Sequence, residues 1–478
     1  MFKISKFLFL IFIIAFSCKE PVDPPITEPE KTDTTKSIRV WLSSHNEVFL
    51  LKQQNSIEYS RDLGDFTINV DSTTSYQSID GFGASLTGSS AFLLQRLNAQ
   101  RRDSILRDLF DPVRGIGINY LRLTIGSSDF SVGTYSYCDT GNINDFAIPQ
   151  RDKTDLLPVL KEILKINPSI KIMASPWSAP AWMKSNNSMY GGSLNGPSVY
   201  NDFAEYFVKY VEAFAAEGIH IDAITIQNEP MHETGGYPTM KMLWTEQNII
   251  IRDFLGPKFA AKGITTKIVI WDHNFDGAYY PLGILGDAET RKYVDGTGWH
   301  GYGGNASAID VVREAYPDIN VYFTEQSGGE WNSGTRMDIV FEYLRNFLMA
   351  TVNRGSKNFI LWNLVLNPEN GPTTTTGGCQ TCRGVITLKD DGSYIRNQEY
   401  YMLGHFSKFV RLDAKRIANS SIGQPDGMLI TSFLNKDGSK VVVVLNESDQ
   451  RRKYNIRIGS RKFIYNQLAK SVVTFKFK

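Results

Sequence analysis

Runs typical of buried β-strands alternate with helical patterns along the middle of the chain. Eight short runs rich in β-branched and other apolar residues lie between residues 76 and 403, and amphipathic segments separate them. This alternation is typical of an α/β fold of the (β/α)₈ TIM-barrel type, in which each parallel strand is followed by a helix. The expected strands are residues 81–85, 118–125, 170–177, 223–229, 267–272, 298–302, 320–325 and 358–364.

The clearest helical pattern covers residues 199–217. Phe203, Phe207 and Phe214 recur there at helical spacing, and Gly218 follows as a helix-ending residue. The pattern predicts an amphipathic helix whose aromatic face packs against the barrel, so these aromatic residues belong to the core and not to a site.

Short alternating runs flank the barrel on both sides. They occur at 38–42 and 66–70 before it, and at 428–433, 441–445 and 471–477 after it. Neither flank has enough strands to form a sandwich alone. We therefore expect residues 37–75 and 410–478 to form one side β-sandwich, beside a catalytic barrel at 76–409.

The first 18 residues have the features of an export segment. Lys3 and Lys6 precede the apolar run 7–16, which is too short to span a bilayer, and Ser17 and Cys18 follow. Residues 1–18 resemble a bacterial lipoprotein signal peptide with Cys18 as the lipidated residue, and an ordinary cleaved signal peptide is the alternative. The Pro-, Thr- and Glu-rich residues 19–36 predict a flexible stalk.

These features predict an exported bacterial lipoprotein of the outer membrane, cell surface or periplasm. Its membrane contact would be through the lipid alone. The 51 Lys and Arg residues nearly balance the 50 Asp and Glu residues, for a net charge of +1. This balance gives no electrostatic basis for nucleic-acid binding.

Three cysteines remain after Cys18. Cys379 and Cys382 form a lone CxxC without a second pair, which does not indicate a zinc site. In an exported protein the pair is either a short-loop disulfide or two free thiols. None of the six histidines has metal-ligand spacing, so no metal or cofactor is expected.

Two predicted strands end in a glutamate. The stretch AITIQNEP (223–230) delivers Glu229, and NVYFTEQS (320–327) delivers Glu325. The carboxyl ends of barrel strands share one face, and two carboxyl groups roughly 5 to 5.5 Å apart are the apparatus of a retaining glycosidase. We expect Glu229 to be the acid/base, because Asn228 beside it can bond the sugar 2-hydroxyl, and Glu325 to be the nucleophile. An ionised Glu325 is expected to raise the pKa of Glu229.

Several motifs extend this interpretation to a family. The chain resembles glycoside hydrolase family 30, which includes glucosylceramidases and β-1,6-glucanases. The similarity begins near Gly81 and continues to the C-terminus. The motifs that carry it are GFGAS (81–85), YLRLTIGSSDFS (120–131), ASPWSAPAWMK (174–184), ITIQNEP (224–230), YFTEQ (322–326), LWNLVLNPENGP (361–372), LGHFSKFV (403–410) and VVVVLN (441–446).

The resemblance implies roles for further residues. Arg122 would hold the nucleophile, Asp129 and Trp177 would bind the nonreducing glucose, Tyr302 would lie beside the nucleophile, and Trp362 would form the pocket floor. The resemblance also implies the acid/base, nucleophile and preceding-asparagine roles already given to Glu229, Glu325 and Asn228. The histidine of the HGY triplet, residue 300, is expected to be a supporting or core residue and not a proton shuttle.

The resemblance leaves the substrate open. The loop 372–383, with its threonine run and CxxC, differs from that of the mammalian enzyme. We expect a retaining hydrolase of β-glucosidic bonds acting on a β-linked glucan or glucoside, with endo-β-1,6-glucan favoured over glucosylceramide. Another family 30 β-glycoside, such as a xyloside, is the alternative within this chemistry. A noncatalytic surface glycan-binding protein is the alternative of a different class.

Overall fold

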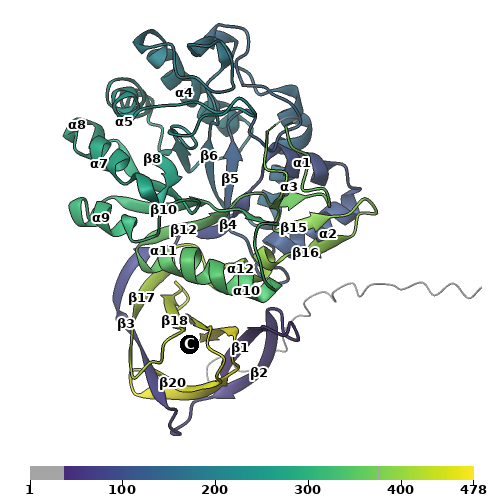
Figure 1. Ribbon diagram of the computed structural model, residues 1–478, viewed down its shortest axis with the longest axis vertical. Coiled ribbons are helices and arrows are strands. Elements are labelled where there is room, and N and C mark those ends of the chain that lie inside the picture. The colour runs from purple at the N-terminus through teal and green to yellow at the C-terminus, as the bar shows by residue number, and fades with distance from the viewer. Residues whose placement is uncertain (1–36, 375–376) are drawn as a thin grey trace, which may run out of the picture.

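The computed structural model describes residues 37–374 and 377–478, and it contains the predicted barrel. Eight strands form a closed parallel sheet in the order β10-β12-β4-β5-β6-β7-β8-β9, drawn in the upper part of Figure 1. Their bounds are β4 (Gly81–Ser85), β5 (Tyr120–Thr124), β6 (Lys171–Ser175), β7 (Ala223–Thr225), β8 (Lys267–Asn274), β9 (Val294–His300), β10 (Asn320–Glu325) and β12 (Ser356–Leu361).

Helices cover the outside of the barrel (Figure 1). They are α1 (Gly88–Gln95), α2 (Ala99–Phe110), α3 (Leu157–Ile166), α4 (Tyr200–Ala216), α5 (Trp244–Ile249), α6 (Gly256–Lys262), α7 (Tyr279–Leu285), α8 (Ala288–Arg291), α9 (Ala308–Ala315), α10 (Arg336–Tyr343), α11 (Met349–Asn353) and α12 (Gln398–Ser407). The predicted helix at 199–217 is confirmed as α4, and its phenylalanines Phe203, Phe207 and Phe214 are buried. No helix in the described ranges is both long enough and apolar enough to cross a membrane.

The fourth barrel strand is shorter than the sequence predicts. β7 ends at Thr225, whereas the strand was expected to continue to Glu229. Beyond Thr225 the chain leaves the ladder: Asn228 N–H donates to the Pro176 carbonyl, and Glu229 N–H donates to the Asp272 carbonyl. Glu229 itself has φ +47°, in the left-handed region that extended strands do not use. The glutamate therefore projects from a turn above the strand.

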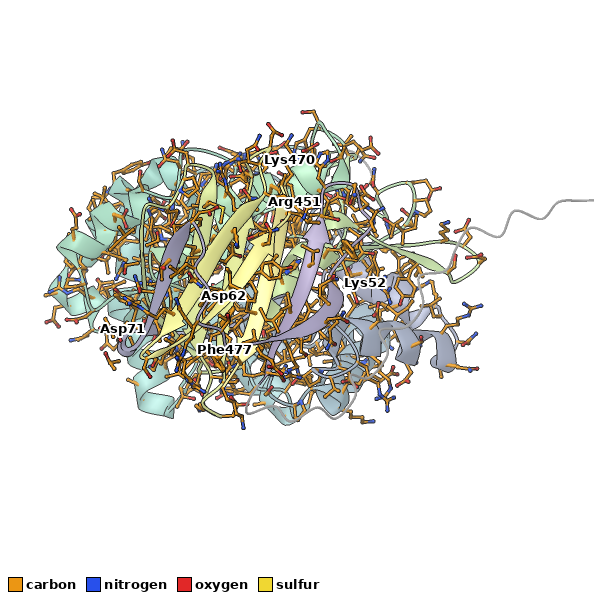
Figure 2. All side chains as sticks on the ribbon, turned by 90° about the horizontal axis from the view of Figure 1, so that it is seen from below. Lys52, Asp62, Asp71, Arg451, Lys470 and Phe477 are labelled. Atoms are coloured by element: carbon orange, nitrogen blue, oxygen red, sulfur yellow. A yellow bond between two sulfur atoms is a disulfide. The ribbon has the colours of Figure 1, made fainter. Side chains whose placement is uncertain are left out.

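The β-domain is one continuous sheet of nine strands. Its order is β2-β1-β22-β19-β18-β17-β3-β20-β21, so strands from both ends of the chain alternate within it. From below, these strands lie side by side beneath the barrel (Figure 2). Their bounds are β1 (Ser37–Ser44), β2 (Lys52–Glu58), β3 (Phe66–Ser78), β17 (Lys415–Ile422), β18 (Met428–Leu434), β19 (Lys440–Asn446), β20 (Arg452–Ile458), β21 (Arg461–Gln467) and β22 (Ser471–Phe477).

The two faces of this sheet have different partners. The sheet folds over so that one face encloses a separate core, which includes Ile38, Val40 and Phe475. Phe463 of β21 thus lies 5.4 Å from Phe475 of β22, although these strands are not neighbours in the sheet. The other face packs on the barrel, where the ring of Trp41 lies 4.4 Å from that of Phe409. The predicted fold of a barrel with a side β-sandwich from both chain ends is confirmed. The predicted signal peptide with Cys18, and the stalk 19–36, lie outside the described residues.

Short strands above the barrel complete the architecture. β11 (Gly328–Gly329) pairs with β14 (Cys382–Arg383), and β15 (Ile386–Leu388) lies between β13 (Val365–Leu366) and β16 (Tyr394–Arg396). The β11–β14 pair attaches the long segment after β12 to the loop after β10, and the other three strands pair within that segment.

Candidate active site

A pocket of about 300 Å³ lies at the carboxyl ends of the barrel strands, and both glutamates line it. Glu325 is the last residue of β10, the seventh barrel strand, while Glu229 follows β7, the fourth. A carboxylate oxygen of each glutamate and a ring nitrogen of His300 all lie within 4.8 Å of one another. The two carboxyl groups thus meet at a spacing suited to a retaining glycosidase and too short for a typical inverting one.

Arg122, from β5, fixes the nucleophile side of the site. Its Nη1 donates to Glu325 Oε2 at 2.5 Å, and its Nη2 donates to Asp272 Oδ2 at 2.7 Å. Burial alone would lower the pKa of Arg122, but the charges of Asp272 and Glu325 outweigh burial and raise it. Arg122 is completely buried, so this permanent charge is stabilised by its hydrogen-bonded partners.

Asn228 is oriented by the same guanidinium. Nη2 of Arg122 also donates to Asn228 Oδ1 at 2.8 Å. Because a guanidinium can only donate, the oxygen of the amide must face Arg122. The Nδ2 donor of Asn228, which lines the pocket, is therefore free to meet a sugar hydroxyl.

Asp272 reaches the centre of the barrel through a distortion of β8. Trp271 and Asp272 have φ values of +74° and +65°, and the register with β9 shifts between Trp271 and His273. Such a bulge re-aims a side chain. The Asp272 carboxylate accepts hydrogen bonds from Arg122 and from Thr225, so its pKa stays well below its ordinary value although burial opposes this.

His300, the last residue of β9, joins Asp272 to the acid/base candidate. Its Nε2 lies 3.0 Å from Asp272 Oδ1, and its Nδ1 lies 3.0 Å from Glu229 Oε1. The ring is completely buried. When both carboxylates are ionised, both ring nitrogens donate and the imidazole carries a positive charge.

These contacts decide where the protons lie in the free site. Burial would lower the pKa of His300, but the charge of Glu325 and the bonds to Asp272 and Glu229 raise it to about 9. Burial would likewise raise the pKa of Glu229, but the hydrogen bond and charge of His300 lower it to about 2. Burial raises the pKa of Glu325, and the charges of His300 and Arg122 offset this only in part.

One expectation from the sequence is wrong for the ligand-free site. The charge of Glu325 was expected to keep Glu229 protonated, but the bonded His300 dominates and lowers the pKa of Glu229. The proton that an acid catalyst needs is therefore held on His300, one 3.0 Å hydrogen bond away. His300 is a buried residue that supports Glu229, as expected from the sequence, and its ring contacts Glu229 directly.

Two tryptophans and an aspartate form one end of the pocket. The rings of Trp177 and Trp362 stack at 4.8 Å with an interplanar angle of 20°, and Arg122 lies 4.8 Å from the Trp177 ring. Asp129 Oδ1 is buried and has no hydrogen-bond partner among the described residues. Burial, with the nearby charges of Glu325 and Glu229, raises the pKa of Asp129 to about 8. A sugar hydroxyl would satisfy this oxygen, and a sugar face would suit the aromatic wall.

Other residues of the pocket lining carry polar groups. Tyr302 donates its hydroxyl to Glu325 Oε1 at 3.0 Å, and His232 lies 2.9 Å from the hydroxyl of Tyr237. His273 and Asn274, from the end of β8, also line the pocket. These rings and hydrogen-bonding groups suit contact with a carbohydrate.

The structure brings together Glu229, Glu325, Arg122, Asn228, Asp129, Trp177, Tyr302 and Trp362, as the resemblance implied. It also joins Cys379 and Cys382 in a disulfide that lines the pocket. Residues that the sequence analysis missed are Asp272, His232, Tyr237, His273 and Asn274. Asp272, His273 and Asn274 lie at or just past the predicted end of the fifth barrel strand. Their position could have indicated a role in the site, because barrel enzymes place site residues at the carboxyl ends of their strands.

Within residues 37–374 and 377–478, Glu229, His300 and Glu325 are also spaced closely enough to share a cation. Arg122 already neutralises Glu325, and both nitrogens of His300 have carboxylate partners. These groups thus already have charged partners within the protein. That the reaction needs no metal stays a prediction from the sequence.

Comparison with known proteins agrees with this geometry. Residues 79–410 match the glycosyl hydrolase family 30 TIM-barrel domain, and residues 413–475 match the family 30 beta sandwich domain. The chain is 33% identical to endo-1,6-beta-D-glucanase neg1 of Aspergillus fumigatus, over 79% of this chain and 81% of that one. It is 30% identical to lysosomal acid glucosylceramidase of Mus musculus, over 78% of this chain and 76% of that one.

A solved structure gives the same result. The endo-beta1,6-glucanase BT3312 superposes with a TM-score of 0.87 at 36% identity, covering 93% of this chain and 99% of that one. Family, fold and paired carboxylates all agree, and the family predicted from the sequence is confirmed. The chain belongs to glycosyl hydrolase family 30, and it is a glycoside hydrolase.

Proposed function

We propose that this protein is a retaining endo-β-1,6-glucanase in which Glu325 is the nucleophile and Glu229 the acid/base. The spacing of the two glutamates carries the mechanistic part, because their oxygens approach within 4.8 Å, well below the roughly 6.5 to 9.5 Å that separates the carboxyl groups of an inverting enzyme. The environment of Glu325 supports its role. Arg122 and Tyr302 bond both of its oxygens and orient the carboxylate for attack.

In the first step, Glu325 attacks the anomeric carbon while the bond to the leaving oxygen breaks. Glu229 donates a proton to that oxygen, and a covalent glycosyl-enzyme forms. Glu229 obtains this proton from Nδ1 of His300, along the 3.0 Å hydrogen bond between them. In the second step, water attacks the anomeric carbon, Glu229 accepts its proton, and Glu325 is released as a carboxylate.

Asn228 contributes to the transition state in this scheme. Its Nδ2 faces the pocket because Arg122 holds its oxygen, so it donates to the sugar 2-hydroxyl. That bond strengthens as the sugar gains oxocarbenium character. Asp129, Trp177 and Trp362 would hold the glucose that becomes attached to Glu325.

The preference for β-1,6-linked glucan is supported by relatives. The proteins similar over most of the chain include endo-1,6-beta-D-glucanases from Aspergillus fumigatus and Trichoderma harzianum, at 33% and 32% identity. Glucosylceramidases also match, at 30% identity or lower. Glucosylceramide is therefore the second candidate substrate.

We also propose that the protein is exported as a lipoprotein anchored through Cys18, with residues 19–36 as a spacer. The support is the order of charge, apolar run and cysteine in residues 1–18. Labelling of expressing cells with a radioactive fatty acid tests this. The wild-type chain should carry the label, whereas the Cys18→Ala variant should not, and unlabelled wild-type protein would contradict the anchor.

Product analysis tests the substrate. Purified protein is incubated in parallel with β-1,6-glucan, β-1,3-glucan, xylan and glucosylceramide, and proton NMR follows the anomeric configuration of the first product. We expect β-configured gentio-oligosaccharides from β-1,6-glucan. Glucose from glucosylceramide alone would favour the second candidate, xylo-oligosaccharides would favour the xyloside alternative, and first-formed α-product would contradict the retaining mechanism.

A further inference from the structure

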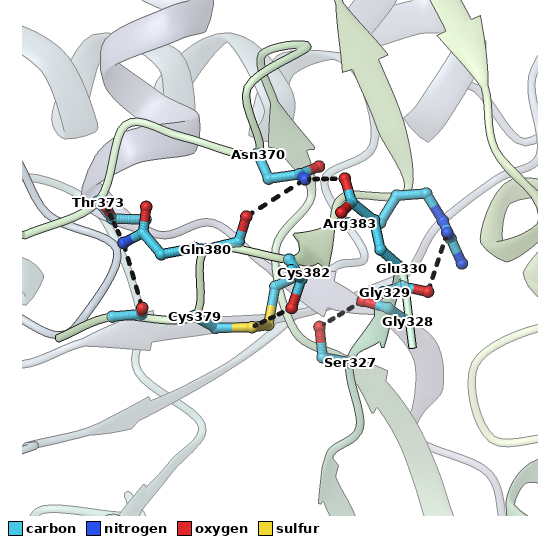
Figure 3. Close-up of a disulfide and its surroundings, with 12 residues drawn as sticks. Ser327, Gly328, Gly329, Glu330, Asn370, Thr373, Cys379, Gln380, Cys382 and Arg383 are labelled. Atoms are coloured by element: carbon cyan, nitrogen blue, oxygen red, sulfur yellow. Dashed lines mark hydrogen bonds between the residues drawn. A yellow bond between two sulfur atoms is a disulfide. The ribbon is translucent and has the colours of Figure 1, made fainter. Parts of the chain in front are cut away.

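The Cys379–Cys382 disulfide lies in the wall of the catalytic pocket, beside the residues assigned to the sugar. Cys382 is almost completely buried, in one apolar cluster with Phe130, Trp177 and Trp362, and Cys379 packs against this cluster. Both cysteines line the same pocket as Glu229 and Glu325. The disulfide is thus continuous with the tryptophan surface that would contact the glucose. Figure 3 shows the disulfide between Gln380 on one side and Ser327 with β11 on the other.

The cysteines belong to the loop 372–383, called the segment below, and this segment contacts loops that follow other barrel strands. On the side of β5, the backbone N–H of Thr374 donates to the Asp129 carbonyl at 2.8 Å. On the side of β7, Gly377 lies against Gly236 so closely that a Cβ on Gly377 would be 2.4 Å from the Gly236 Cα. The segment therefore supports the backbone of Asp129 and meets the loop that carries Tyr237.

The other end of the segment is attached to the loop after β10, which begins at the nucleophile. Cys382 pairs with Gly329 between β14 and β11, and Glu330 N–H donates to the Thr381 carbonyl at 2.9 Å. The Asn370 side chain donates to Glu330 Oε1 at 2.7 Å (Figure 3). Cys382 is thus held by a strand pair, and the disulfide extends this attachment to Cys379.

Reduction must alter this wall. Two thiol sulfurs cannot approach as closely as two bonded sulfurs, so breaking the bond moves at least one of them. Cys382 is buried and its backbone pairs with Gly329, so we expect the half-buried Cys379 to be the side chain that moves. Its movement would disturb the surface beside Trp177 and Trp362, and through Gly378, which abuts Asp129, the position of that carboxyl group. Among the described residues, the side chains hydrogen-bonded to the carboxylates of Glu229 and Glu325 are those of Arg122, Tyr302 and His300, which lie outside the loop 372–383.

We propose that the intact Cys379–Cys382 disulfide is a substrate-positioning element of the sugar pocket, whose reduction weakens sugar binding and leaves the catalytic chemistry in place. The inference rests on the proposed function, because it assigns this end of the pocket to the glucose. It makes substrate affinity dependent on the redox state of the surroundings.

The test compares KM and kcat for the full chain with and without dithiothreitol, on β-1,6-glucan and on an aryl β-glucoside. Dithiothreitol transfers two electrons and two protons to the disulfide, becomes a cyclic disulfide, and leaves two thiols. We expect KM to rise by about tenfold, the loss of affinity that corresponds to about one sugar hydrogen bond, with kcat changed less than about twofold. Oxidised glutathione takes two electrons and two protons from the Cys379 and Cys382 thiols and becomes two glutathione molecules. The protein disulfide then forms again, and KM should return to its original value.

The variants give a matched comparison. The Cys379→Ala/Cys382→Ala double variant should have the raised KM and no response to dithiothreitol. Cys138→Ala is the control, because Cys138 is a free buried cysteine outside the pocket, and it should respond as the wild type does. Thermal unfolding shows whether each protein is folded under the assay conditions. If the double variant fails to fold, the reversible response of wild type and Cys138→Ala decides the question.

Three outcomes would overturn the proposal: an unchanged KM after complete reduction, a fall in kcat at constant KM, or an undiminished response in the double variant. Calorimetric binding of gentiobiose, with and without reductant, gives a readout that is independent of turnover. If the oxidised protein binds gentiobiose but hydrolyses no β-glucoside, the proposed function fails. The disulfide inference is then decided by whether reduction weakens that binding.

Discussion

The Nδ1 atom of His300 lies 3.0 Å from Oε1 of Glu229, so the acid/base candidate is bonded to a buried imidazole. The other ring nitrogen is held by Asp272 at 3.0 Å. The arrangement stores a proton next to the group that must deliver it. It also keeps that proton within the protein up to the pKa of His300, about 9.

His300→Gln should move the basic limb of the kcat/KM profile to lower pH. In the wild type the stored proton is lost only as pH rises through about 9. Without the imidazole, Glu229 must hold the proton itself and loses it at a lower pH. We expect at least about a tenfold fall in kcat/KM at pH 8, within the range that acid–base catalysis contributes. His220→Gln, at an exposed histidine, is the control. An unmoved limb would show that His300 does not supply the proton.

The two glutamates should differ in their dependence on the leaving group. Glu325→Gln should abolish turnover of every substrate, because no glycosyl-enzyme can form, while sugar binding persists. Glu229→Gln should lose about 10² to 10⁴ in rate on glucan but much less on the glycosylation step of dinitrophenyl β-glucoside, whose leaving group needs no proton. Pre-steady-state release of dinitrophenolate measures that step. Full activity of Glu325→Gln would refute the assignment.

Asp129 should act as a neutral carboxyl group at neutral pH. Its pKa of about 8 means that it is protonated below that value and ionises above it. Asp129→Asn is neutral at all pH values and should therefore keep KM within about tenfold of the wild-type value at pH 6. Asp129→Ala should raise KM further, because it removes the hydrogen bonds to the sugar. The KM of the wild type should rise above pH 8 and that of Asp129→Asn should not. Parallel pH series of KM for the three proteins check both statements.

His405 should make the stability of the protein fall in acid. Its ring lies between Ser43 and Thr474, 2.8 Å from each hydroxyl, where α12 meets the β-sheet. Burial lowers the pKa of His405 to about 3, below the value of about 6.5 in an unfolded chain. Its contribution is therefore complete above about pH 6.5 and is lost as pH falls toward 3, at about 1.4 kcal/mol per pH unit.

Urea unfolding at pH 7, 6, 5 and 4 measures this effect. His405→Gln keeps hydrogen-bonding groups but cannot be protonated, so its free energy of unfolding should fall less steeply below pH 6.5. His220→Gln again serves as the exposed control. Parallel curves for wild type and His405→Gln would exclude His405 as the cause.

Helices and strands were predictable from the sequence where a buried face gives apolar residues a regular spacing. The aromatic residues of α4 repeat at helical spacing because one face is buried, and the predicted helix 199–217 matches Tyr200–Ala216 closely. β7 was predicted too long, since an apolar run looks the same whether or not its backbone remains in the ladder. The left-handed φ of Glu229 and the bulge at Asp272 leave no signal in hydrophobic periodicity.

The sequence by itself determined that Glu229 and Glu325 share a face, because parallel barrel strands end on the same side and each glutamate ends such a run. It also determined the family, through motifs spread over most of the chain. Only the tertiary structure decided which groups surround each carboxylate. His300, Asp272 and Arg122 come from three separate strands, and interaction energies between buried charges depend steeply on distances of a few ångströms. The location of the proton, and the disulfide in the pocket wall, follow from those distances and not from the order of the residues.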